Sequence, residues 1–274
     1  MNTLTKNPVL LQFANIFFLV MVLIMNIAAT SLPLGGITTE EISDALPSYF
    51  TPAGYTFAIW GLIYTALIAF AVFQARPIER TRPFLAKISW LFVLSSIANS
   101  AWIAAWHFGY FALSVVLMLV LLGSLIAIYL RLNIGRLDPA LSWQDKLFYQ
   151  APFSLYLGWI TVATIANIAS VTNYLGWNGF GIAEPIWAMI MIGTAVLVAA
   201  ILLINRRNLA YAGVLVWALF GIRASAIASG EPTLAAFAVG AAVIITGLAA
   251  LGYYRTRSQK EQPADQLTTA SQAV

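Results

Sequence analysis

The sequence has no cysteine, a single histidine (His107) and few charged residues. Without cysteine, the chain has no disulfide, no thiolate metal site and no cysteine nucleophile, and one histidine cannot form a histidine-cluster metal site. Charged residues make up 9% of the chain, compared with roughly 25% in soluble proteins. These shortages exclude a cytosolic enzyme and a nucleic-acid-binding domain, because too few charges are available for a water-exposed surface or a phosphate backbone.

Two further absences concern catalysis and energy use. No G-x-x-x-x-G-K-[ST] motif occurs, so direct ATP-driven transport by this chain is not expected. The apolar segments contain almost no titratable side chains, so we assign no catalytic residue and no metal ligand. The chain is not expected to be an enzyme.

Hydrophobic residues, by contrast, make up 61% of the chain, and the mean hydropathy is +0.85. A bilayer core about 30 Å thick requires roughly 20 apolar residues per helix. Isolated strands cannot satisfy their backbone groups in lipid, so we expect an all-α integral membrane protein with about eight transmembrane helices. The third run contains Ser95, Ser96, Asn99 and Ser100, which places it inside the bundle. The expected spans are 9–30, 54–74, 88–106, 110–130, 148–170, 183–204, 209–228 and 232–254.

The basic residues predict the orientation of these spans. Thirteen of the 14 lysines and arginines lie in the N-terminus, in alternate loops or in the tail, and only Arg223 lies within a span. Cytoplasmic loops of membrane proteins carry an excess of these residues. We therefore expect a multi-pass protein of the cell (inner) membrane with both termini in the cytoplasm.

The expected organisation has three parts. Residues 1–174 form a five-helix membrane bundle, residues 175–256 add three transmembrane helices, and the polar stretch 257–274 forms a disordered cytoplasmic tail. The long loop 31–53 is either a solvated connection or a lid over the bundle, with a short helix starting near Thr38–Glu41.

Aromatic and amide residues recur at helical spacing on three of the spans. Each set falls on one helical face, and intramembrane amides are costly unless they point inward and pair. The faces therefore predict either helix–helix hydrogen bonds with packed rings, or a pocket for a large, planar, apolar ligand. Trp90, Trp143, Trp177 and Trp187 lie near span ends and are interpreted as interfacial anchors. The three sets are Phe57, Trp60 and Tyr64; Asn99, Trp102 and Trp106; and Tyr156, Trp159, Ala163 and Asn167.

These residues carry a resemblance to a known family. The stretch Phe50–Tyr64, the Asn99-Ser-Ala-Trp102 motif and the Tyr156-Leu-Gly-Trp159 motif followed by Ala163 and Asn167 resemble motifs of the TspO/MBR family. These are the tryptophan-rich sensory proteins, related to the translocator protein (peripheral benzodiazepine receptor). The resemblance covers roughly residues 9–170 and marks the chain as an extended, divergent member.

The resemblance implies a ligand. Family members bind porphyrins and haem-like tetrapyrroles, and some bind sterols. The expected function is thus binding of such a planar hydrophobic molecule, with a sensory, regulatory or translocator role. No cofactor is required, and protoporphyrin or haem would be a ligand held by the three aromatic–amide faces.

Other possibilities remain open at this point. Arg223 either pairs structurally with Glu184 or Glu231, or contacts an anionic group of the ligand. His107 is either a surface residue or a ligand of haem iron. The chain is alternatively a small-molecule transporter or permease component, or a membrane scaffold without a ligand. The expected partners are membrane lipid, a hydrophobic small molecule and a second copy in a homodimer, but no nucleic acid.

Overall fold

The structure, a computed structural model, describes residues 7–31, 36–46, 48–136 and 138–271. Within these residues every regular element is helical. Seven helices are long and apolar enough to cross a membrane, which confirms the all-α membrane fold. The elements are α1 (Pro8–Ser31), α2 (Thr39–Ala45), η3 (Gly54–Ala58), α3 (Ile59–Gln74), η4 (Pro77–Thr81), α4 (Pro83–Ile88), α5 (Leu91–His107), α6 (Phe111–Arg131), α7 (Trp143–Asp145), η5 (Lys146–Gln150), α8 (Ala151–Tyr174), η6 (Gly179–Gly181), α9 (Glu184–Arg206), α10 (Leu209–Ala228) and α11 (Pro232–Ser271).

The third expected span, 88–106, corresponds to α5 and is the one that is not among the seven. It has 17 residues and is therefore about 25 Å long. It begins later than expected because Ser89 adopts a positive φ of 52° and separates it from α4. Most of α5 is buried, including Ser95, Ser96 and Asn99. The expectation of an interior helix is met. Among the described residues, the number of helices long and apolar enough to cross a membrane is seven rather than eight.

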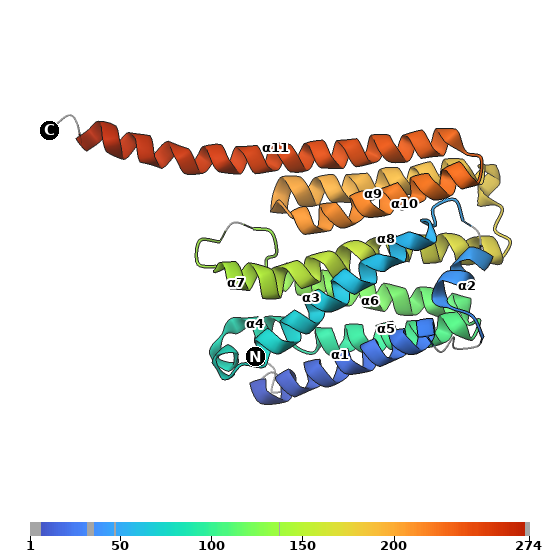
Figure 1. The fold of residues 1–274 in the computed structure, drawn as a ribbon, viewed down its shortest axis with the longest axis horizontal. Coiled ribbons are helices and arrows are strands. Elements are labelled where there is room, and N and C mark those ends of the chain that lie inside the picture. The colour runs from blue at the N-terminus through green and yellow to red at the C-terminus, as the bar shows by residue number, and fades with distance from the viewer. Residues whose placement is uncertain (1–6, 32–35, 47, 137, 272–274) are drawn as a thin grey trace.

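The long helices run side by side and alternate in direction (Figure 1). α5 packs between α1 and α6, while α8 contacts α3, α6 and α10. α11 packs against both α9 and α10. α10 thus joins the last three helices to the first five. Close approach of α8 and α10 depends on Gly158, where a Cβ would lie 3.0 Å from Val214 Cβ.

The two ends of the bundle differ. One end carries α2 and is called the α2 end here; the other carries α4 and α7 and is called the α7 end (Figure 1). α1 begins at the α7 end, and α11 extends beyond that end. α11 is helical as far as Ser271, so it includes most of the stretch 257–274 for which the sequence predicts a disordered tail. The stretch contains four Gln and three Ala, which favour helix.

A π-helical turn joins α7 to α8. The turn spans Lys146–Gln150 and ends two residues before Pro152, which lies in the first turn of α8. Proline has no N–H and its ring collides with the carbonyl four residues earlier, and a wider turn relieves both problems. This turn carries the buried residue Tyr149 and follows directly on Asp145.

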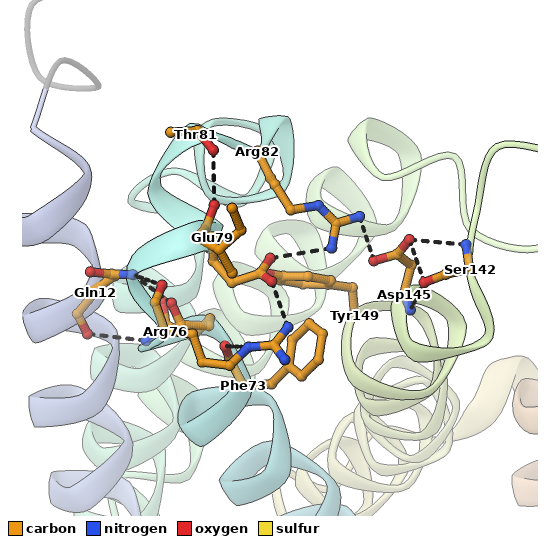
Figure 2. A network of polar contacts seen from close by, with 11 residues as sticks. Gln12, Phe73, Arg76, Glu79, Thr81, Arg82, Ser142, Asp145 and Tyr149 are labelled. Atoms are coloured by element: carbon orange, nitrogen blue, oxygen red, sulfur yellow. Dashed lines mark hydrogen bonds and ion pairs between the residues drawn. The ribbon is translucent and has the colours of Figure 1, made fainter.

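Buried charges close the α7 end of the bundle. Glu79 and Asp145 are each 1% exposed and are joined by Arg82, whose Nη2 lies 2.7 Å from Asp145 Oδ1 and whose Nη1 lies 3.4 Å from Glu79 Oε2 (Figure 2). Arg76 Nη2 and the Tyr149 hydroxyl also donate to the Glu79 carboxylate, over 2.6 and 2.8 Å. The cluster ties the α3–α5 connection to α7 and to the π-turn that precedes α8.

Candidate functional site

The three aromatic–amide faces meet around a cavity near the α2 end. α3 with η3, α5 and α8 bring their faces together, and α6 adds Met118. Of the ten candidate residues, eight line this cavity: Phe57, Trp60, Asn99, Trp102, Trp106, Trp159, Ala163 and Asn167. The regular spacing along each helix therefore corresponds to one shared wall rather than to three separate faces.

The rings form two groups on the walls. Trp102 and Trp106 of α5 are stacked, with centroids 5.9 Å apart. In the second group, the Trp159 ring lies edge-on to Phe57 and to Trp60, with centroid separations of 5.8 and 6.3 Å. Trp102, Trp106 and Trp159 are all less than a tenth exposed. Flat apolar surfaces held in this way suit a flat apolar ligand.

Tyr64 and Tyr156 lie behind this wall and do not line the cavity. Tyr64 stacks on Trp60 with a centroid separation of 5.0 Å, and Tyr156 meets Trp60 at 6.0 Å. The Tyr156 hydroxyl accepts a hydrogen bond from Asn99 Nδ2 over 3.1 Å. These two tyrosines therefore position Trp60 and Asn99 instead of facing the cavity.

The two amides pair across helices, as one of the sequence interpretations required. Asn99 Oδ1 accepts from Asn26 Nδ2 of α1 over 3.1 Å, so Asn99 joins α1, α5 and α8. Asn167 Nδ2 donates to Ser114 Oγ of α6 over 3.0 Å. Both amides still border the cavity, so the packing and pocket interpretations describe the same residues.

Arg223 lies elsewhere. It is exposed on α10 and does not line the aromatic cavity. His107 is buried, and its Nδ1 lies 2.9 Å from the Ile103 carbonyl oxygen while Nε2 lies 3.5 Å from Thr39 Oγ1. Because a carbonyl only accepts, Nδ1 carries a proton, and both ring nitrogens of His107 are engaged within the protein.

Sequence spacing missed the residues that cover the cavity. Thr39 and Ser43 reach it from one face of α2, and Thr51 and Pro52 reach it from the loop before η3. Loop residues carry no periodic signal, so only the structure assigns them. On α8, Ala166 and Ser170 extend the face of Trp159 and Ala163 at helical spacing, and that signal was available in the sequence.

α2 is held over the cavity as a lid. It begins with a capping box, in which Glu41 N donates to Thr38 Oγ1 and Glu41 Oε2 accepts from Thr38 N. These bonds with Thr38 lower the pKa of Glu41. Trp106 Nε1 donates to the Thr39 carbonyl over 3.4 Å. The lid interpretation of loop 31–53 is therefore the one that the described part of this loop supports.

The loop between the lid and α3 rests on α10. Ala53 N donates to the Gly221 carbonyl over 3.1 Å, and Trp217 Nε1 donates to the Thr56 carbonyl over 3.0 Å. A Cβ at Gly221 would overlap Thr56 Cγ2 and lie 2.9 Å from Pro52 Cβ. The C-terminal helices thus hold in place a loop that lines the cavity.

The cavity is small and partly polar. Its volume is about 50 Å³, against roughly 300–1,000 Å³ for pockets that enclose small-molecule ligands. Two buried polar atoms on its lining residues, Trp102 Nε1 and Thr51 Oγ1, have no hydrogen-bond partner among the described residues. Buried polar groups are normally paired, so these two atoms are exceptions on the lining residues.

Comparison with known proteins identifies the same family as the aromatic–amide motifs. The sequence pattern of the family described as TSPO-like protein matches residues 12–251. The match extends through the last three helices, beyond the 9–170 stretch that the motifs suggested. No curated protein and no solved structure matches the chain. Since the family match covers most of the sequence, the protein is a membrane protein that belongs to the TSPO-like family.

Proposed function

We propose that the protein binds a planar apolar ligand, with a tetrapyrrole such as protoporphyrin or haem as the first candidate, in the aromatic cavity. The observation that supports this most directly is the convergence of three aromatic–amide faces on one cavity whose lining includes two unpaired polar atoms. Rings would stack on the ligand, and Trp102 Nε1 would meet its polar edge. We further propose a sensory or regulatory role in which occupancy changes the position of α2.

A tetrapyrrole does not fit a cavity of about 50 Å³, so binding requires movement. α2 is a separate helix of seven residues that covers the cavity with Thr39 and Ser43, so it is the element that we expect to move. The α7 end is tied together by the Glu79–Arg82–Asp145 cluster. Opening at the α2 end alone favours ligand binding over passage through the bundle.

Iron ligation is not part of this proposal. His107 does not line the cavity, and its two ring nitrogens contact Ile103 and Thr39. Haem and metal-free protoporphyrin are therefore expected to bind through the same stacking and polar contacts.

Protoporphyrin is expected to bind saturably to the purified protein, and Trp102→Ala or Trp159→Ala is expected to weaken binding by about tenfold each, since an aromatic contact contributes up to about 1.5 kcal/mol beyond area burial. Titration followed by porphyrin absorbance measures this without depending on protein fluorescence. Trp102→Phe keeps a ring but loses Nε1, so its affinity should lie between those of the wild type and Trp102→Ala.

Trp143→Phe is the matched control, because Trp143 is 67% exposed at the α7 end. Its affinity should equal that of the wild type. Equal affinities for all of these variants, combined with lowered thermal stability of the Trp102 and Trp159 variants, would instead support a scaffold whose rings only pack.

Gly54→Ala tests the lid. A Cβ at Gly54 would collide with the Glu40 carboxylate of α2, and this exposed side chain would turn away and release one lid contact. Porphyrin association measured by stopped flow should accelerate about threefold, because such an exposed contact is worth less than about 1 kcal/mol. Gly61→Ala, where a Cβ meets open space, should associate at the wild-type rate; identical rates for the two variants would contradict the lid.

We also propose that the α7 end faces the cytoplasm of a cell (inner) membrane, with both termini on that side. The basic linkers after α3, α6 and α9 all lie at this end, as cytoplasmic loops should. The chain has no cysteine, so single cysteines introduced into these linkers can be labelled from one side of intact vesicles. Labelling by a reagent on the non-cytoplasmic side would contradict the proposed orientation. A homodimer stays a prediction.

A further inference from the structure

A second, larger cavity lies at the α2 end, beside the aromatic cavity. Its volume is about 430 Å³, within the range of small-molecule pockets. It is bounded by α2, the loop 48–53, the first residue of α9 and the last turn of α10. Ser43, Thr51 and Pro52 line both cavities, so the larger cavity adjoins the aromatic one across a shared wall.

The charges on this larger cavity are of one sign. Among the described residues that line it, the charged ones are Asp44 and Glu184. Arg223 lies two residues before the lining residue Ser225, yet does not itself line the cavity. The C-terminal end of α10, which carries a partial negative charge, also borders it. The partial positive charge at the start of α9 is offset by Glu184 itself.

A buried polar group independently points to a ligand here. Thr51 is 8% exposed, and its Oγ1 has no hydrogen-bond partner among the described residues. An unpaired buried hydroxyl costs roughly 1–3 kcal/mol, which a hydrogen bond to a ligand would recover. Ser43, Ser48, Ser225 and Ser229 add further hydroxyls to the lining.

Aromatic residues line the same cavities as the carboxylates. Tyr49 lines the larger cavity and also an adjoining one of about 360 Å³, whose walls include Trp177 and Trp187. The rings of these two tryptophans are 5.3 Å apart, and Glu184 lines both cavities. Ring faces beside carboxylates are the combination that binds organic ammonium groups.

We propose that this part of the α2 end is a binding site for an organic cation, with Asp44 and Glu184 as counter-charges and Tyr49 as a ring wall. A bare divalent metal ion does not suit it, because such ions require several close oxygen ligands, and no group of three His, Cys, Asp or Glu residues in the described part of the chain could hold one. A bulky ammonium suits the volume and the mixture of rings, hydroxyls and carboxylates. The site goes beyond the proposed porphyrin function and does not depend on it.

Benzyltrimethylammonium, titrated calorimetrically into the full-length protein in uncharged maltoside micelles, tests the site. Saturable binding is expected for this cation and none for benzenesulfonate, which has a similar ring and the opposite charge. Asp44→Asn and Glu184→Gln should each weaken binding about threefold and together about tenfold, because exposed ion pairs contribute up to about 1 kcal/mol each. Added salt should weaken binding as well.

Glu231→Gln is the matched control, because this carboxylate lies at the same end but does not line the cavity. Its affinity should be unchanged. Equal binding of the cation and the sulfonate, or wild-type affinity in the Asp44→Asn/Glu184→Gln double variant, would overturn the inference. Trp159→Ala, which impairs only the porphyrin site, should keep cation binding, so failure of one site is distinguishable from failure of the other.

The ammonium group has two possible sources, a soluble amine and a choline lipid headgroup. Short-chain phosphatidylcholine added below its micellar concentration distinguishes them. Displacement of benzyltrimethylammonium supports the site with a lipid headgroup as its occupant, and binding that persists supports it with a soluble amine.

Discussion

Replacing Arg82 by methionine is expected to lower the free energy of unfolding by about 3 kcal/mol, because a buried charge that loses its partner is strongly destabilising. Asp145 would be left 1% exposed with hydrogen bonds only from Ser142. Burial lowers the pKa of Arg82, but the hydrogen bond to Asp145 and the negative charges around it together raise this pKa above its ordinary value. Reversible unfolding in mixed micelles, or the melting temperature in maltoside, measures the loss.

Two variants serve as controls for Arg82→Met: Asp145→Asn alone, and Asp145→Asn combined with Arg82→Met. Arg82 is partly exposed and keeps Glu79 as a neighbour, so Asp145→Asn should cost only about 1 kcal/mol. Arg82→Met combined with Asp145→Asn should be more stable than Arg82→Met alone, since the stranded charge is gone. Equal losses for the two single variants, with additive effects in the double, would show that the pair does not couple.

Gly221→Ala is expected to destabilise the protein by about 1–3 kcal/mol, as overpacking does in a tight interior. The added methyl group would overlap Thr56 Cγ2 and press on Pro52, pushing α10 away from the loop that lines the aromatic cavity. The Trp217–Thr56 hydrogen bond would lengthen with it. Porphyrin affinity should therefore fall together with the melting temperature, although Gly221 lies on one of the last three helices.

Gly213→Ala lies on the same helix, where a Cβ meets open space. Alanine in a helix interior is about 0.5–1 kcal/mol better than glycine, so this variant should be as stable as the wild type or slightly more stable, with unchanged ligand affinity. If Gly221→Ala lowered stability without changing porphyrin affinity, α10 would not control the cavity.

Much of the fold follows from apolar run length and from the alternation of basic loops. The span 209–228 agrees with α10 at both ends, and 110–130 agrees with α6 to within one residue. The starts of α5 and α8 differ from the expected spans for local reasons. Ser89 turns the chain with a positive φ before α5, and the π-turn before Pro152 precedes α8. Neither a serine with a positive φ nor a π-turn changes hydropathy, so the length of an apolar run alone does not locate them.

The candidate site was predictable only where it is helical. Eight of the ten residues chosen by spacing line the cavity, because residues on one inward face of a helix meet the same space. Spacing does not show that Tyr64 and Tyr156 support the wall from behind, since depth depends on neighbouring helices. Thr51 and Pro52 come from a loop, and their position depends on Gly221, about 170 residues later in the chain.

The wall shared by the two cavities has a thermodynamic consequence. Ser43, Thr51 and Pro52 face both spaces, so a ligand that displaces this wall changes the free energy of binding at the other cavity. Such coupling is reciprocal: the factor by which one ligand alters the affinity of the second equals the factor by which the second alters the first. Occupancy at the surface of the α2 end would thereby set the threshold concentration at which the buried site responds.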